Sequence, residues 1–162
     1  MTELVVNLAM YGFPLAALPF AVRIDPSARR IAVLSLFVAP LLGAATYLVL
    51  KRRFSLAGVA GVLPFAVVPL GFWAALLAAL ATPALRRAHD LLRARPSAFV
   101  VTSAAGGAVI GAAFMWGFSV LVATIRPVAG QIDIPPHVLA GLSAGAFVAT
   151  IAGRPFVGRF TP

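Results

Sequence analysis

The sequence predicts an all-α fold, a polytopic transmembrane helical bundle of about five spans, from three observations. The chain of 162 residues is 62% hydrophobic and only 10% charged, whereas soluble domains carry about 25% charged residues. Five uncharged stretches reach or approach the roughly 20 helical residues that cross a hydrocarbon core of about 30 Å. All seventeen charged residues lie outside these stretches, because a charge at mid-bilayer costs about 2.5–3.5 kcal/mol. We therefore expect a single transmembrane domain over residues 1–162.

The first two expected spans cover about residues 4–22 and 31–50. The first contains Pro14 and Pro19, and a proline inside a helix removes a backbone hydrogen bond, so we expect this helix to be kinked. The second is an uninterrupted apolar run. Basic residues flank it at Arg29, Arg30, Lys51, Arg52 and Arg53.

The third span, about 60–83, belongs to the uncharged stretch 54–85, which has 32 residues. As one helix this stretch would extend about 48 Å, which is longer than the membrane core but too short for two crossings. One reading is a single crossing, kinked near Pro64 and Pro69, whose lead-in lies at the interface. The other is a re-entrant hairpin that turns between Pro64 and Gly71. We favour the single crossing, because irregular backbone at that depth needs cover from protein or water.

The fourth and fifth spans are about 98–125 and 137–153. We expect Ser97, directly after Pro96, to cap the fourth helix. The fifth is short, and we expect it to begin after a pair of prolines and to end at Gly153 before the next proline.

Small residues dominate these last two spans. Gly107 and Gly111 form one GxxxG pattern, and Gly141 and Gly145 form another. This spacing puts the glycines on one helical face, where two backbones can approach closely. The sequence leaves two readings open, namely packing of these helices within the chain or a docking face for a second protein or copy.

The distribution of basic residues predicts the orientation, since cytoplasmic loops carry the excess of Lys and Arg. With either reading of the third segment, nine of the thirteen cations fall on one side and four on the other. The 86–95 loop and the C-terminus are then cytoplasmic and the 126–137 loop is external. The N-terminus is external with five crossings and cytoplasmic with the hairpin. Twelve of the thirteen cations are Arg, which we interpret as a GC-rich coding bias and hence a bacterial cytoplasmic (inner) membrane.

The expected cytoplasmic loop Leu85–Arg95 holds the candidate functional residues outside the spans. We interpret it as an interfacial amphipathic turn whose arginines lie at anionic phospholipid head groups. Its His–Asp pair also leaves open a catalytic role, although such a role needs a second positioned group that is not evident. The candidates are Arg86, Arg87, His89, Asp90, Arg93 and Arg95.

The sequence argues against several functional classes. The interiors of the expected spans contain no ionisable side chain, whereas proton-coupled transporters, haem-binding helices and intramembrane metalloproteases need one. Cysteine is absent. The cations form short groups between apolar runs, which is atypical of nucleic-acid binding. We therefore expect no catalytic residue, cofactor, metal or nucleic acid.

Three hypotheses of function remain. The favoured one is a non-catalytic accessory or scaffold subunit that associates with other membrane proteins, or with itself, through Gly/Ala helix faces. The first alternative is a small transporter or channel component with a polar path near Asn7 or Pro64–Pro69. The second is a lipid-modifying enzyme that acts at the cytoplasmic loop.

Overall fold

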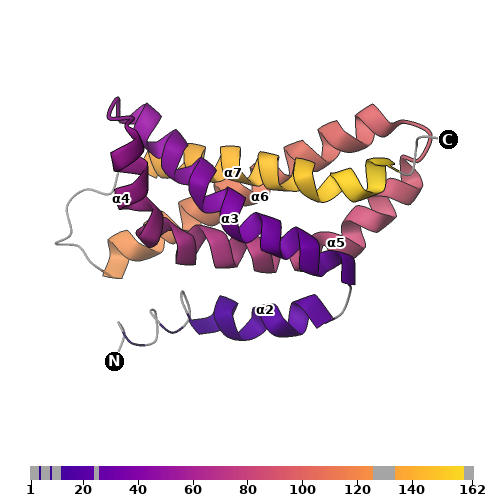
Figure 1. The fold of residues 1–162 in the computed structure, drawn as a ribbon, viewed down its shortest axis with the longest axis horizontal. Coiled ribbons are helices and arrows are strands. Elements are labelled where there is room, and N and C mark those ends of the chain that lie inside the picture. The colour runs from indigo at the N-terminus through magenta and orange to yellow at the C-terminus, as the bar shows by residue number, and fades with distance from the viewer. Residues whose placement is uncertain (1–3, 5–7, 9–11, 24–25, 126–133, 159–162) are drawn as a thin grey trace.

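The computed structural model is all-α, as predicted, and it describes residues 4, 8, 12–23, 26–125 and 134–158 (Figure 1). Six α-helices and one π-helical segment lie within these residues. They are α2 (Phe13–Arg23), α3 (Pro26–Leu50), α4 (Leu56–Ala66), η2 (Val67–Phe72), α5 (Trp73–Leu91), α6 (Pro96–Ile125) and α7 (Ile134–Val157).

The helices α2, α3, α5, α6 and α7 run along the long axis of the molecule, whereas α4 lies across one end (Figure 1). Two packed pairs organise the bundle, because α5 packs mainly against α3 and α6 packs mainly against α7. Contact between α3 and α7 joins the pairs, and it includes a hydroxyl–hydroxyl hydrogen bond of 2.9 Å between Thr46 and Ser143. The helix α2 lies outside, against α3 and α5.

The interior of the bundle is built from small side chains and its surface from large apolar ones. Among the described residues, eleven of the eighteen buried hydrophobic residues are alanine. Phe20, Phe37 and Trp116 instead point outward, each more than half exposed. In water this arrangement would be unfavourable. It suits a lipid environment, where the exterior is apolar and helices associate through close packing of small residues.

Three of the helices are long and apolar enough to cross a membrane, which suggests a multi-pass membrane protein. These candidate spans are Ala28–Leu50, Pro96–Thr124 and Ile134–Val157. The other two expected spans are divided among shorter elements. Within the expected span 4–22, the helix that the structure describes is α2, which has eleven residues. The expected span 60–83 is divided among α4, η2 and α5.

Prolines begin or extend several helices instead of delimiting them. The helix α6 begins at Pro96, so Ser97 lies in its first turn and is not the expected cap. In α7 both Pro135 and Pro136 lie in the first turn, and the helix continues through Gly153 and Pro155 to Val157. Proline is tolerated in a first turn because the N–H groups there have no intrahelical acceptor. The last span is therefore longer than predicted.

The long stretch after the second span is helical and bends without reversing. Ser55 caps α4 by accepting a hydrogen bond of 2.9 Å from the Gly58 N–H. The π-helical turn η2 contains Pro69, which lacks an N–H and so interrupts the α-helical hydrogen bonds. Beyond this point the chain runs along the bundle as α5 (Figure 1). The helices α4 and α5 do not pack side by side, as the two halves of a re-entrant hairpin would.

Eight of the eleven Lys and Arg residues in the described segments lie at one end of the bundle. This end carries the C-terminal end of α2, the start of α3, the α5–α6 turn and the end of α7 (Figure 1). It therefore holds eight cations, namely Arg23, Arg29, Arg30, Arg86, Arg87, Arg93, Arg95 and Arg154. The opposite end, between α3 and α4, holds Lys51, Arg52 and Arg53, while Arg126 and Arg159 lie outside the described residues.

Candidate functional site

The four glycines of the GxxxG patterns lie in the contact between α6 and α7. Gly107 faces Gly145 and Gly111 faces Gly141, so the two helix backbones touch. A Cβ atom at any of the four would lie under 3.0 Å from the backbone oxygen of its partner. The chain's own helices therefore pack on each other through these glycines.

The predicted cytoplasmic loop is mostly helix. The helix α5 continues to Leu91, so that the turn to α6 spans only residues 92–95. Arg86, Arg87, Arg93 and Arg95 are exposed on this end of the molecule.

His89, in contrast, belongs to the packed interior and is only 5% exposed. Its ring lies 5.8 Å from the ring of Phe99 and 5.9 Å from that of Phe156, measured between centroids. The Nδ1 atom is 3.3 Å from the Asp90 carboxylate, a long hydrogen bond, and the Asp90 side chain is 79% exposed. His89 thus fills the junction of α5, α6 and α7. Among the described residues no group of three His, Cys, Asp or Glu side chains is placed to hold a metal ion.

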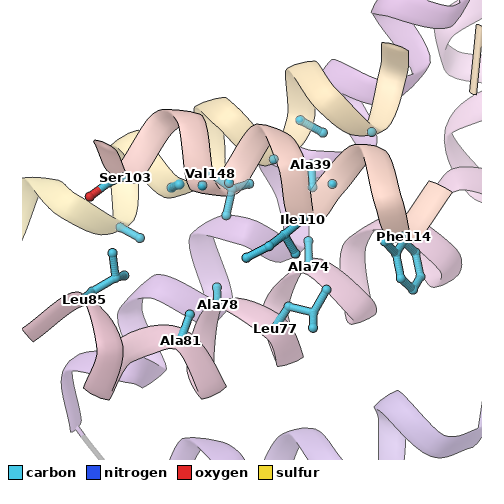
Figure 2. Close-up of a pocket in the computed structure, with 18 of the residues that line it drawn as sticks. Ala39, Ala74, Leu77, Ala78, Ala81, Leu85, Ser103, Ile110, Phe114 and Val148 are labelled. Atoms are coloured by element: carbon cyan, nitrogen blue, oxygen red, sulfur yellow. The ribbon is translucent and has the colours of Figure 1, made fainter. Parts of the chain in front are cut away.

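An apolar groove lies between α5 and α6, with a volume of about 280 Å³ (Figure 2). Ala81 and Leu85 of α5 form one wall, and Ile110 projects from α6 toward α5 across the space (Figure 2). Ala39 of α3 and Val148 of α7 also line it. We call this space the α5–α6 groove.

The groove exists because α5 and α6, although consecutive in the chain, make few contacts with each other. The Gly–Gly contacts hold α6 against α7. On the other side, Gly71 lets the start of α5 approach α3, since a Cβ there would lie 2.7 Å from the carbonyl oxygen of Leu36. That oxygen lacks its usual helical donor because residue 40 is proline. Because α5 packs on α3 and α6 packs on α7, a space remains between α5 and α6.

The lining of the groove is almost entirely apolar, with Thr102 and Ser103 as its polar side chains. Gly106 also lines it and differs from the glycines of the α6–α7 contact, because a Cβ there would meet nothing within 4 Å. No pattern in the sequence pointed to this groove. The sequence shows that Ala74, Ala78 and Ala81 are spaced to lie on one helical face. It does not show which other helix lies opposite that face.

No protein-family model, no curated protein and no solved structure matches this chain. The structure accordingly suggests a class of protein, namely a multi-pass membrane protein with three candidate spans.

Proposed function

We propose that this chain is a non-catalytic multi-pass membrane protein, an accessory or scaffold subunit that binds another component of the bilayer in the α5–α6 groove. The observation that carries the proposal is the groove itself, about 280 Å³ of apolar space between helices held apart by other contacts. Helices in lipid associate by close packing. An occupant that restores the packing missing between α5 and α6 is therefore favoured.

We also propose that the chain crosses the membrane five times. Residues 67–85 form η2 and the apolar part of α5, nineteen uncharged residues, which as a helix extend about 28 Å and match the hydrocarbon core. The helix α2 runs along the same axis (Figure 1). The end with eight described cations would be cytoplasmic and the end with three external, in the membrane that the arginine-rich composition indicates, the bacterial inner membrane.

The alternatives have less support. A transporter for polar solutes needs hydrogen-bonding groups along its path, and the groove offers only two hydroxyl side chains. Asn7 lies outside the described residues. A lipid-modifying enzyme using His89 would need this side chain at an accessible site, but His89 is enclosed by two phenylalanine rings and does not line the groove.

Photo-crosslinking tests the proposed binding face, because the chain has no cysteine of its own. Gly106→Cys and Gly117→Cys would each be labelled with a benzophenone maleimide in the native membrane. Both positions are on α6 and both have open space at the Cβ, but only Gly106 lines the groove. We expect a discrete adduct, with protein or lipid, from Gly106→Cys alone. Identical adduct patterns from the two positions would refute the groove as the binding face.

A further inference from the structure

We propose that the α5–α6 groove takes one acyl chain of an anionic phospholipid, whose phosphate is held by the arginines at the α5–α6 turn. This inference rests on the proposed function, since it identifies the occupant of the same groove. The occupant comes from the leaflet at the basic end of the bundle. Three independent features favour it, namely the size of the groove, the chemistry of its lining and the charge at its closed end.

The volume of the groove suits a hydrocarbon chain better than a helix. A helix with its side chains is about 10–12 Å across, so 280 Å³ corresponds to only about 3 Å of its length. A hydrocarbon chain, whose atoms keep about 4 Å from their neighbours, has a cross-section of roughly 20 Å². The same volume then holds about 14 Å of chain, close to half of the roughly 30 Å hydrocarbon core.

The lining matches such a chain over most of its length. Apart from two residues, the side chains that line the groove are alanine, glycine and larger apolar residues, which offer dispersion contacts and no hydrogen bonds. The two polar residues, Thr102 and Ser103, lie toward the turn that joins α5 to α6. A lipid that enters the groove from the side, with its head group toward this turn, would place its polar region there and its apolar chain deeper along the groove.

The closed end of the groove is strongly basic. The lining residues reach Ala88 on α5 and Thr102 on α6, so the intervening turn closes this end. Around it lie the exposed residues Arg87, Arg93 and Arg95. Arginine binds phosphate in a bidentate manner, and basic pockets between transmembrane helices bind anionic head groups. The positive N-terminal end of the α6 dipole adds to the same field.

Photoactivatable lipids provide the test. The purified full-length protein would be reconstituted in phosphatidylcholine vesicles that contain either phosphatidylglycerol or phosphatidylcholine carrying a mid-chain diazirine. After illumination, peptide mass spectrometry would locate the adducts. We expect phosphatidylglycerol adducts on residues that line the groove, in roughly hundredfold excess over phosphatidylcholine adducts, given three arginines that each contribute about 1 kcal/mol near the surface.

Matched variants separate the apolar and the charged parts of the site. Gly106→Phe fills the groove and should abolish the adducts, whereas Gly117→Phe, also in open space but outside the groove, should retain them. Ala81→Phe fills the groove from the other wall, and it provides the same test if Gly106→Phe does not fold. The double variant R87Q/R95Q should lower phosphatidylglycerol labelling about thirtyfold, at about 1 kcal/mol per arginine, and R52Q/R53Q, with the same loss of charge at the other end, should not.

Equal labelling by the two lipids, or adducts that persist when the groove is filled, would overturn the lipid proposal. A co-purifying protein helix crosslinked in the groove from Gly106→Cys would also overturn it, yet would leave the proposed function standing. If neither lipid nor protein forms an adduct at Gly106→Cys, both proposals fail.

Discussion

Replacing Gly111 by alanine tests the packing of α6 on α7 most directly. In the structure the Cβ of this alanine would lie under 3.0 Å from the backbone oxygen of Gly141. A backbone oxygen cannot rotate away as the end of a flexible side chain can. The two helices would therefore have to separate, and the other glycine contacts along the same crossing would loosen with them.

The expected loss of unfolding free energy in Gly111→Ala can be worked out by comparison with Gly106→Ala on the same helix. Overpacking a well-filled interior costs about 1–3 kcal/mol, and a rigid backbone neighbour places Gly111→Ala in the upper part of this range. Alanine is also about 0.8–1.0 kcal/mol more favourable than glycine within a helix, but this gain applies to both variants. At Gly106 a Cβ meets nothing within 4 Å. The difference in unfolding free energy between the variants should therefore be about 2–3 kcal/mol.

The assay is reversible unfolding of the purified proteins in mild detergent, titrated with sodium dodecyl sulfate and followed by circular dichroism. Gly111→Ala should unfold at a lower dodecyl sulfate fraction than the wild type, and Gly106→Ala at the same fraction or a higher one. In the double variant with Gly141→Ala the losses should be less than additive, because helices already separated accommodate the second Cβ. If Gly111→Ala and Gly106→Ala unfold at the same fraction, the helix contact is not as described.

Three further predictions concern other parts of the molecule. Phe99→Ala, which empties a fully buried site beside His89, should destabilise the protein by about 3–5 kcal/mol in the same titration; a loss below 1 kcal/mol would contradict the aromatic junction. Gly71→Ala should destabilise the fold through its contact with α3, whereas Gly61→Ala, in open space, should not; equal stability would refute the close approach. In intact cells an impermeant maleimide should label Leu56→Cys and not Leu91→Cys, since the two exposed positions lie at opposite ends of the bundle; protection of Leu56→Cys would overturn the five-crossing topology.

The fold class and the likeness to a membrane protein could be predicted from the amino-acid sequence, because both follow from local composition. Charges are excluded from long apolar runs whatever the neighbouring helices do, so the long α3, α6 and α7 could be located from the uncharged stretches. The GxxxG spacing likewise marked Gly107, Gly111, Gly141 and Gly145 as positions of close backbone approach. The bounds of the helices were less accurate, since prolines in first turns, as at Pro96 and Pro135, continue a helix that the sequence suggests they precede.

Which helix faces are covered and which are open depends on how the helices pack in three dimensions. The glycine patterns could not reveal that their partner is the neighbouring helix of the same chain, nor could His89 be recognised as buried, because both depend on residues distant in sequence. The groove arises in the same way. It exists because Gly71 lets α5 pack on α3 while four glycines let α6 pack on α7, and the choice of packing partner is a property of the assembled bundle that no local pattern encodes.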